Sequence, residues 1–408
     1  MKRLLQINTI ANSGSTGRIA EGIGNASVEA GYSSFVAYGR FANPSSSHLI
    51  RIGQKKDYLI HGVRSRIFDD HGMGSVAATR ALLKQMDEIQ PDIVHLHNIH
   101  GYYLNYPLLF QYLNVKNIPV VWTLHDCWPF TGHCAYFDYC GCDKWKNGCS
   151  HCPQKKTYPA SYVFDRSRQN WLDKKHYFTL PARMEIVAVS NWLGGLIRES
   201  FLGKYSVHTI YNGIDTSVFR PYPIAATRAK YGWDNDQIIL LGVASMWSPR
   251  KGLADFIELS KILPENYRIV LIGLNEKQMK NLPANITAFA KTESVQMLAE
   301  LYSIANVSLN LSYEETMGLT TVEAFACGTP GIVYDKTASP ELIKSDDVGF
   351  IVPAGNINVL FDVISRVLSQ KKESYIKNCR SYALANFRQE DRFQEYVNLY
   401  QRLFKENG

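Results

Sequence analysis

The chain has 408 residues, 46% of them apolar and 20% charged, which is ordinary for a globular protein of about two domains. The formal net charge of +7 favours anionic partners such as phosphates, but no run of five or more basic residues indicates a nucleic-acid-binding protein. No stretch of roughly 18 apolar residues could span a bilayer, and the N-terminus resembles a buried strand more than a signal peptide. We therefore expect a cytoplasmic protein.

Short runs of Val, Ile and Leu alternate with helical patterns along the whole chain. In the first half the runs are "RLLQINTI", "SSFVAYG", "DIVHLH", "PVVWTLH", "EIVAVS" and "VHTIYN", and in the second "IILLGVAS", "YRIVLIG", "NITAFA", "NVSLNLS" and "GIVYD". Near-continuous apolar runs separated by helices indicate parallel sheets covered on both faces. The pattern predicts an α/β protein with two doubly wound, Rossmann-like domains.

The first glycine-rich loop, "ANSGSTGRIAEGI", follows the first predicted strand and precedes a helix. Gly14, Thr16 and Gly17 stand where backbone N–H groups and a helix N-terminus favour an anion such as phosphate. A turn with an ordinary helix cap explains the same residues, so both interpretations stay open.

The segment "YLIHGVRSRIF" carries basic residues in or near it. They fit either a basic face for an anionic membrane or a solvated helix face, and peripheral membrane association at the inner face of the cell membrane is one expectation. These residues are Lys55, Lys56, Arg64, Arg66, Arg80 and Lys84.

In "VVWTLHDCWPFTG", His125 and Asp126 come directly after a predicted strand. In open α/β sheets, ligands bind beyond the carboxyl ends of the strands, so His125 is a candidate to hydrogen-bond a substrate or carry a proton. The alternative is a histidine satisfied by its neighbours.

Six of the eight cysteines fall between Cys127 and Cys152. Cys149 and Cys152 have the spacing of half a zinc knuckle, and a second pair could come from Cys134 with Cys142, or with Cys140 in its place. A structural zinc on four thiolates would order a loop that has little core of its own, and reduced buried thiols are the alternative.

The domain boundary is predicted within "VHTIYNGIDTSVFRPYPI", where Asn212-Gly213 and two prolines break the pattern. We predict one domain over 1–210 and another over 211–388. A helix over 389–408 follows, with apolar residues at helical spacing: Phe393, Val397, Tyr400 and Phe404.

Two loops of the second domain combine charges suited to a diphosphate. In "GVASMWSPRKGL", Arg250 and Lys251 precede a helix, and a solvated basic pair is the plainer explanation. In "YEETMGLTTVEAFACGTPGIV", Glu315 precedes a helix that begins after Gly318, and Glu323 lies within its first turns. A carboxylate such as Glu323 can accept two hydrogen bonds from a ribose diol.

These residues carry a resemblance to a known family. "EETMGLTTVEAFACGTPGIV" resembles the paired-glutamate motif of the retaining GT-B glycosyltransferases of family 4, and "SMWSPRKG", "YNGIDTSVF" and the N-terminal glycine loop are similar to further parts of it. The segment "TLHDCWPFTGHCAYFDYCGCDKWKNGCSHCP" resembles a branch that makes colanic acid or capsules. The resemblance implies two Rossmann-like domains facing across a cleft, with the C-terminal helix crossing back to the first.

The resemblance also implies roles for single residues. Lys251 matches the residue that binds the donor diphosphate, Glu315 the acid near the donor sugar and Glu323 the ribose binder. Gly17 and His125 match the first-domain loop glycine and the histidine near the donor sugar. Further expected donor contacts are Lys291 and Thr292 near the base, and the loop and helix start at Met317, Gly318 and Leu319.

The sequence departs from the family pattern at two places. The usual arginine five residues before the lysine is Met246 here, and Arg250 is a candidate to replace its charge. Thr316 and Met317 stand where Gly-Phe is usual.

The resulting expectation is transfer of a sugar, with retention, from a nucleotide-diphosphate sugar to a glycan or polyprenyl-linked acceptor in bacterial surface polysaccharide synthesis. No cofactor is expected for the chemistry. A nucleotide-sugar epimerase and a non-catalytic sugar-binding module with the same fold are the alternatives.

Overall fold

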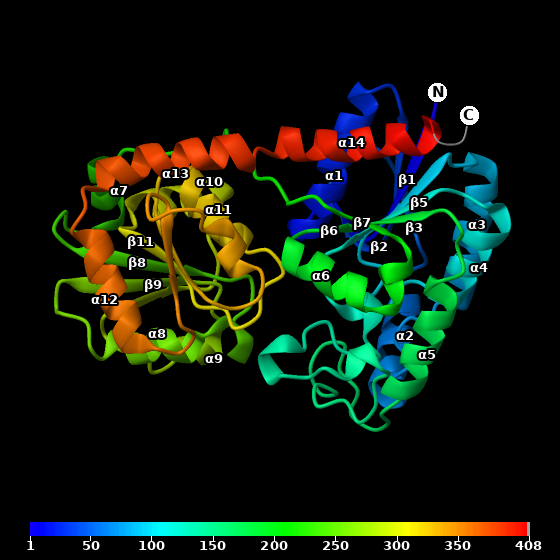
Figure 1. Cartoon of the computed structure of the whole chain (residues 1–408), viewed down its shortest axis with the longest axis horizontal. Coiled ribbons are helices and arrows are strands. Elements are labelled where there is room, and N and C mark those ends of the chain that lie inside the picture. The colour runs from blue at the N-terminus through cyan, green and yellow to red at the C-terminus, as the bar shows by residue number, and fades with distance from the viewer. Residues whose placement is uncertain (406–408) are drawn as a thin grey trace. The chain divides into compact units, whose positions relative to one another are not determined.

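A computed structural model describes residues 1–405 and divides the chain into two compact α/β units. Unit 1 comprises Met1–Tyr211 together with the C-terminal helix from Glu390, and unit 2 comprises Asn212–Gln389 (Figure 1). The predicted helix over 389–408 extends beyond the described residues at 406–408. Among residues 1–405, none of the helices is long and apolar enough to cross a membrane.

Unit 1 contains a seven-stranded parallel sheet in the order β3-β2-β1-β4-β5-β6-β7. Strand β1 pairs with β2 on one side, where Leu5 lies opposite Phe35, and with β4 on the other, where Leu5 lies opposite Val94. The strands are β1 (Arg3–Ala11), β2 (Ser33–Ala42), β3 (His48–Arg51), β4 (Ile93–Leu96), β5 (Val120–Leu124), β6 (Met184–Ala188) and β7 (Ser206–Thr209).

The connections between these strands are mostly helical, as parallel pairing requires. The long connection from β5 to β6 instead begins with a loop that holds only short 3-10 turns, and this loop contains the cysteine cluster. The helices of unit 1 are α1 (Gly14–Glu29), α2 (Lys55–Phe68), α3 (Val76–Ile89), α4 (Tyr106–Lys116), α5 (Ser167–Phe178), α6 (Asn191–Glu199) and α14 (Gln389–Lys405).

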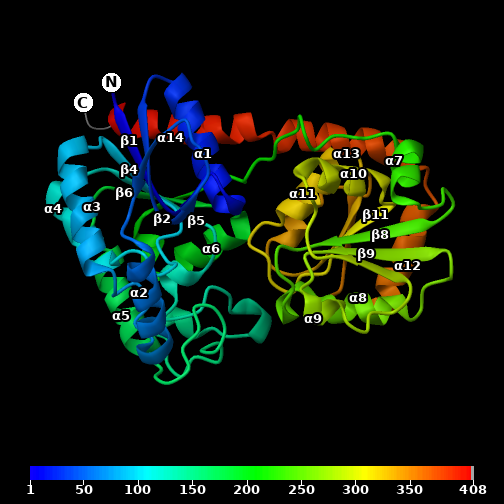
Figure 2. The same cartoon turned by 180° about the vertical axis from the view of Figure 1, so that it is seen from behind.

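The C-terminal helix α14 completes the core of unit 1, lying along α1 and β1 in both views (Figures 1 and 2). Its Tyr400 hydroxyl meets Nδ1 of the buried His95 on β4 at 2.6 Å. Its apolar face packs with Leu4, Ile23 and Ile93 through five side chains: Phe393, Tyr396, Val397, Leu399 and Tyr400. The 3.6-residue spacing of these side chains explains why one face of the helix is buried.

Unit 2 contains a six-stranded parallel sheet in the order β10-β9-β8-β11-β12-β13. Its strands are β8 (Ile238–Val243), β9 (Tyr267–Ile272), β10 (Ile286–Phe289), β11 (Val307–Asn310), β12 (Gly331–Tyr334) and β13 (Gly349–Val352). Its helices are α7 (Ile224–Tyr231), α8 (Leu253–Ser260), α9 (Glu276–Met279), α10 (Val295–Ile304), α11 (Leu319–Ala326), α12 (Ile357–Leu368) and α13 (Lys372–Asn386).

In each sheet the first strand lies beside the fourth, β1 beside β4 and β8 beside β11, with successive strands running outward on either side. The strand order therefore reverses at these two pairs, and each unit has the doubly wound, Rossmann-like topology that the sequence predicts. At such a reversal the loops after the two central strands diverge to opposite faces and leave a crevice for ligands.

Two strands of the structure were absent from the predicted set. β3 (His48–Arg51) is an edge strand with largely exposed side chains, and β13 (Gly349–Val352) is a short edge strand that begins with a glycine. An edge strand such as β3 need not be apolar on both faces, so it lacks the near-continuous apolar run by which the central strands were recognised. β13 is instead apolar and largely buried, with only Ile351 exposed, so its residues fit a buried strand that the predicted set omitted.

The chain enters and leaves unit 2 at neighbouring positions. The Ile214 amide donates to the Phe387 carbonyl at 2.9 Å, and the Gln389 amide donates to the Ile214 carbonyl at 3.1 Å. A Cβ on Gly213 would lie 2.3 Å from Gln389 Cα, so a glycine is required where the two segments cross.

Replacement of Gly273 by alanine should strongly destabilise unit 2. Gly273 follows β9 with φ of +99°, and a Cβ there would lie 1.7 Å from the Ala244 carbonyl oxygen at the end of β8. We expect Gly273→Ala to cost about 2 to 4 kcal/mol. Gly232→Ala, also at positive φ but in open space, is the matched control and should cost only about 1 kcal/mol. Equal thermal unfolding shifts for the two variants would contradict this account.

Candidate functional site

The loop after β8 in unit 2 is held against the end of β11. Arg250 and Lys251 lie in a 3-10 turn, Pro249–Lys251, followed by Gly252 at φ of +72°. A Cβ on Gly252 would lie 2.1 Å from the Leu311 carbonyl oxygen, and the Tyr313 amide donates to the Arg250 carbonyl at 2.8 Å. The two loops that leave the sheet at its reversal point are therefore joined backbone to backbone.

A buried ion pair joins the same two loops through their side chains. Lys251 Nζ contacts Glu315 Oε2, and the side chains are only 17% and 14% exposed. Burial would raise the pKa of Glu315, but the charges of Lys251 and Arg250 hold it below its ordinary value. Burial also lowers the pKa of Lys251, although Glu315 opposes that shift. The pair is a preformed dipole at the point where a ligand of this fold binds.

The Arg250 guanidinium also reaches the loop after β11. Its Nη1 donates to the Glu314 carbonyl at 2.8 Å, which anchors the side chain beside Lys251. Met246, which stands where the family pattern has an arginine, is 74% exposed. The structure thus places Arg250, and not position 246, next to the ion pair.

The loop after β11 turns into α11 at Gly318. Gly318 has φ of +90° and is the N-cap of α11, with no side chain capping the first amides of the helix. Met317 is buried, and its Sδ accepts a hydrogen bond from the Asn212 amide at 3.1 Å, so its side chain attaches the loop to the start of unit 2. Backbone N–H groups here, with Leu319 as the first helical residue, can bind an anion.

The remaining predicted donor contacts in unit 2 lie on α11 and after β10. Glu323 is half-buried on the second turn of α11, and its Oε2 accepts from the Tyr302 hydroxyl at 3.0 Å. Lys291 and Thr292 follow β10, which two strands separate from β11 in the sheet. The structure therefore groups Arg250, Lys251, Glu315 and Gly318, and sets the Lys291–Thr292 loop apart from them.

In unit 1 the glycine loop occupies the corresponding position after β1. Gly14, at φ of +58°, begins α1 and is exposed, while Thr16 lines a cavity. Gly17 is buried, and a Cβ there would lie 3.2 Å from the Ile10 carbonyl oxygen. Gly17 thus allows α1 to approach β1 closely, whereas Gly14 and Thr16 are the members of this loop that a ligand can reach.

His125, which is partly buried after β5, lies at one end of a hydrogen-bonded row with the buried His97, after β4, and the buried Gln6 on β1. Its Nε2 lies 3.3 Å from His97 Nδ1, and His97 Nε2 lies 3.0 Å from Gln6 Oε1. Burial lowers the pKa of His125 to about 4, despite the opposing charge of Asp126. His125 is consequently a neutral hydrogen-bonding group near pH 7 and carries no positive charge there.

A cavity of about 520 Å³ opens at the reversal point of the unit 1 sheet. Within it His100 Nε2 contacts Asp126 Oδ2 at 2.9 Å, and His100 Nδ1 contacts the Tyr158 hydroxyl at 2.9 Å. Arg40 provides a positive charge on the wall. The lining also includes Thr9, Ile10, Thr16, Phe41, Asn98, Gly101, Ala135 and Tyr136.

Sequence reasoning did not assign roles to Arg40, His100 or Tyr158. His100 could have been found from its place just after β4, by the same strand-end argument that selected His125. Arg40 lies on β2, and Tyr158 lies in a loop far along the chain, so neither position signals the cavity.

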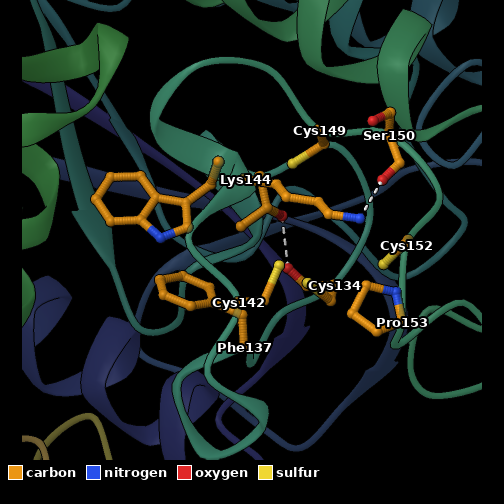
Figure 3. Close-up of a pocket in the computed structure, with 10 residues that line it drawn as sticks. Cys134, Phe137, Cys142, Lys144, Cys149, Ser150, Cys152 and Pro153 are labelled. Carbon is orange, nitrogen blue, oxygen red and sulfur yellow. Dashed lines mark hydrogen bonds between the residues drawn. The ribbon is translucent and has the colours of Figure 1, made fainter.

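The cysteine loop brings four of the predicted zinc ligands to one small pocket. Cys134, Cys142, Cys149 and Cys152 all line it together with Phe137, as Figure 3 shows. Trp145 also lines the pocket. The space open to a water molecule is about 10 Å³, which is about the minimum that one water needs. Cys140 lies outside the pocket, and its Sγ donates to the Phe137 carbonyl.

As they stand, the thiols do not form a closed ligand shell. Within residues 1–405, no three His, Cys, Asp or Glu side chains are gathered in positions that could hold a metal ion. Zinc binding by this loop therefore stays a prediction, and it requires the thiols to turn toward a common ion.

Two buried groups beside this pocket are compatible with a thiolate centre. Lys174 is fully buried, and its Nζ donates to the Trp128 and Thr131 carbonyls at 2.7 and 3.0 Å. Burial lowers the pKa of Lys174 to about 7, while the neighbouring thiols Cys149 and Cys134 act to raise it when ionised. His133 is oriented by Asp69 through a 2.5 Å contact at Nδ1, and among the described residues its buried Nε2 has no partner.

Both halves of the chain match models of glycosyltransferase families. Residues 17–218 match Glycosyltransferase Family 4, and residues 223–384 match Glycosyl transferases group 1. The chain is 26% identical over 347 residues to a colanic acid biosynthesis glycosyl transferase, WcaC, of Escherichia coli strain K12, covering 77% of each chain. It is 27% identical over 289 residues to alpha-monoglucosyldiacylglycerol synthase of Acholeplasma laidlawii, covering 65% of this chain and 64% of that protein.

Solved structures share the fold over essentially the whole chain. A sucrose-phosphate synthase from Thermosynechococcus elongatus superposes with a TM-score of 0.74 at 18% identity, covering 100% of both chains. Anabaena Alr3699/HepE, solved in complex with UDP, gives a TM-score of 0.67 at 15% identity, covering 98% of this chain and 100% of that one. The fold is that of the GT-B glycosyltransferases.

Unit 1 should lose stability as the pH falls from about 6.5 toward 4. Burial holds the pKa of His61 and His125 at about 4, and those of His71, His95 and His97 well below the ordinary value. Between these values the unfolded chain binds protons that the folded chain does not, so stability rises with pH. We expect a lower thermal midpoint at pH 5 than at pH 7.

The contribution of His125 can be separated by substitution. His125→Gln should reduce the loss of unfolding free energy between pH 7 and pH 5 by up to about 2 kcal/mol, whereas the exposed His176→Gln should leave it unchanged. A thermal midpoint that stays constant between pH 7 and pH 5 would refute the assignment of neutral buried histidines.

The zinc prediction is tested by elemental analysis of the purified chain. We expect about one zinc per chain, because one pocket holds four thiols. Cys149→Ser and Cys152→Ser should each abolish the bound zinc, whereas Cys140→Ser, outside the pocket, should keep it. A wild-type chain that contains no zinc after expression with added zinc would disprove the prediction.

Proposed function

We propose that this chain, which belongs to the GT-B glycosyltransferases of family 4 and group 1, is a retaining enzyme of surface polysaccharide synthesis. It would transfer a sugar from a nucleotide-diphosphate sugar to a glycan or polyprenyl-linked glycan. The observation that carries this proposal is the buried Lys251–Glu315 pair at the reversal point of the unit 2 sheet, beside Arg250 and the start of α11.

This arrangement suits a donor that leaves as a diphosphate. Arg250, Lys251 and the amides at the start of α11 would stabilise the negative charge that grows on the leaving phosphate oxygens. Binding of a diphosphate would also give Lys251 a second anionic partner and leave Glu315 able to orient a sugar hydroxyl. Glu323 is positioned by the Tyr302 hydroxyl, and a carboxylate has two oxygens that can accept hydrogen bonds from ribose hydroxyls.

Retention follows if the acceptor attacks from the face that the leaving group occupies. The bond between the anomeric carbon and the phosphate oxygen breaks with both electrons going to the phosphate. The acceptor oxygen then bonds the oxocarbenium-like carbon and gives its proton to that phosphate oxygen. No side-chain nucleophile is required, and His125, being neutral, would hydrogen-bond a sugar hydroxyl.

The donor and acceptor are proposed from relatives and from the unit 1 cavity. HepE was solved with UDP, so a uridine-diphosphate sugar is the first donor to test. WcaC is described for colanic acid biosynthesis, and the cavity lined by Arg40, His100 and Asp126 offers polar groups for a glycan acceptor. Its volume of about 520 Å³ is in the range of small-molecule sites.

Lys251→Ala should reduce turnover by roughly 10²-fold or more, because it removes charge stabilisation of the leaving diphosphate. Glu315→Gln should reduce it as well, with a donor KM that changes less than turnover. Met246→Ala, on the exposed side of the same loop, should keep near-normal activity as the matched control. Release of nucleotide diphosphate with the donor sugar and a glycan acceptor measures the effect.

Product analysis separates this proposal from its alternatives. An epimerase would convert the donor without an acceptor, and a binding module would neither convert nor hydrolyse it. Retention requires that the new linkage has the anomeric configuration of the donor, as read by NMR. Normal turnover in Lys251→Ala would overturn the assigned role of the ion pair.

A further inference from the structure

The helix α2 of unit 1 has its apolar face turned outward. Its buried residues are His61, Gly62 and Ser65. His61 explains this orientation, because its Nδ1 contacts Ser75 Oγ at 2.9 Å and its Nε2 accepts from the Gly72 amide at 3.1 Å. The polar side of α2 is therefore anchored to the loop before α3.

The outward side of α2 continues into a neighbouring loop. The Tyr162 amide donates to the Arg66 carbonyl at 2.8 Å, the Phe164 amide donates to the Ile67 carbonyl at 3.0 Å, and the rings of Phe68 and Phe164 stack at 5.8 Å. We call the combined patch the α2 surface. Its members are each between 37% and 67% exposed: Leu59, Ile60, Val63, Ile67, Phe68, Tyr162, Val163 and Phe164.

Such a concentration of large exposed apolar side chains is unusual for a protein surface in water. Exposure of these side chains to water costs free energy, which their burial against an apolar phase would recover. Along a helix of 14 residues, about 21 Å long, the patch is extended and convex, as a helix lying on a surface would be.

Basic side chains accompany the α2 surface. Lys55, Lys56 and Arg66 are exposed on α2, and Lys155 Nζ donates to the Val163 carbonyl at 3.3 Å. Arg64 is partly neutralised by its ion pair with the buried Asp70.

Two acids lie in the same segments. Asp57 accepts from the Gln54 amide, and the exposed Asp165 accepts from the Cys152 amide. The four cations that are not paired with Asp70 outnumber these two acids, so the charge beside the apolar face is positive.

We propose that the α2 surface binds unit 1 to a bilayer that contains anionic lipids. The apolar side chains would enter the boundary between headgroups and acyl chains, and the aromatic rings suit that boundary. Each exposed Lys or Arg would be attracted to the negative lipid surface. A bilayer matches both the apolar face and its positive charge, whereas a neutral apolar partner would match only the first.

This surface is connected to the cavity of unit 1 through one loop. Tyr158, whose hydroxyl contacts His100 in the cavity, lies four residues before Tyr162 and is itself partly exposed. If the proposed glycosyl transfer holds, a lipid-linked acceptor could reach that cavity directly from the bilayer. The membrane proposal itself does not depend on catalysis.

Vesicle sedimentation with the full chain tests the proposal. Phosphatidylcholine vesicles with about one third phosphatidylglycerol should bind the chain at least tenfold more tightly than pure phosphatidylcholine vesicles, and 0.5 M salt should weaken that binding. Ile60→Gln with Val63→Gln should reduce binding at least tenfold. Val28→Gln with Val115→Gln removes two exposed valines elsewhere in unit 1 and should leave it unchanged.

The contribution of the basic residues is tested with a second variant and its matched control. Lys55→Gln with Lys56→Gln should weaken binding to the anionic vesicles, whereas the exposed Lys277→Gln with Lys280→Gln in unit 2 should not. Ile60→Trp, which adds a residue favoured at bilayer interfaces, should strengthen binding and shift tryptophan emission to shorter wavelength with the same vesicles. Tighter vesicle binding by this variant cannot be explained by a loss of function, which would only weaken binding.

Three outcomes would overturn the proposal. One is failure of the wild-type chain to bind anionic vesicles, and another is equal binding by the α2 and control variants. The third is a wild-type dimer in sedimentation velocity that Ile60→Gln with Val63→Gln converts to a monomer, because a second copy would then cover the surface. Glycosyl transfer to a water-soluble acceptor should be unchanged in these variants, so the two proposals fail separately.

Discussion

The site in unit 2 depends on the contact between Lys251 and Glu315. These residues come from loops that leave the sheet at its reversal point. If either residue were removed, the charge of the other would be buried without a partner, which is strongly destabilising. The backbone bond from Tyr313 to Arg250 and the close approach of Gly252 to Leu311 hold the loops in register. A buried pair of this kind adds little net stability, so its value lies in fixing charges where a ligand can use them.

Much of this arrangement was predictable from the sequence because it follows from local rules. The apolar runs identified the central strands, and the strand-end rule selected the loops that contain Lys251, Glu315 and His125. The sequence does not predict which of these loops are adjacent, because adjacency depends on the order of the strands in the sheet. The cavity residue Tyr158 meets His100 across 58 positions of the chain, and no periodic pattern signals such a contact.

The helix α2 shows a second limit of sequence reasoning. Apolar residues on one helical face ordinarily indicate the buried side. Here His61 is hydrogen-bonded to Gly72 and Ser75 in the loop that follows α2, and these bonds hold the polar side of the helix inward while Ile60 and Val63 stay exposed. The basic residues near this helix were noticed in the sequence, but only the structure distinguishes an apolar outward face from a solvated one.

The double passage of the chain between the units has a consequence for synthesis on the ribosome. Unit 2 is contiguous, from Asn212 to Gln389, and all its strands and helices have been made before α14 begins. Unit 1 begins at residue 1, yet five side chains of its core cluster belong to α14. A nascent chain that ends before residue 390 therefore exposes the apolar surface against which Tyr396, Val397 and Tyr400 will pack. Unit 1 is thus completed only after unit 2 has been made, and its unfilled core must stay free of other contacts until α14 has emerged.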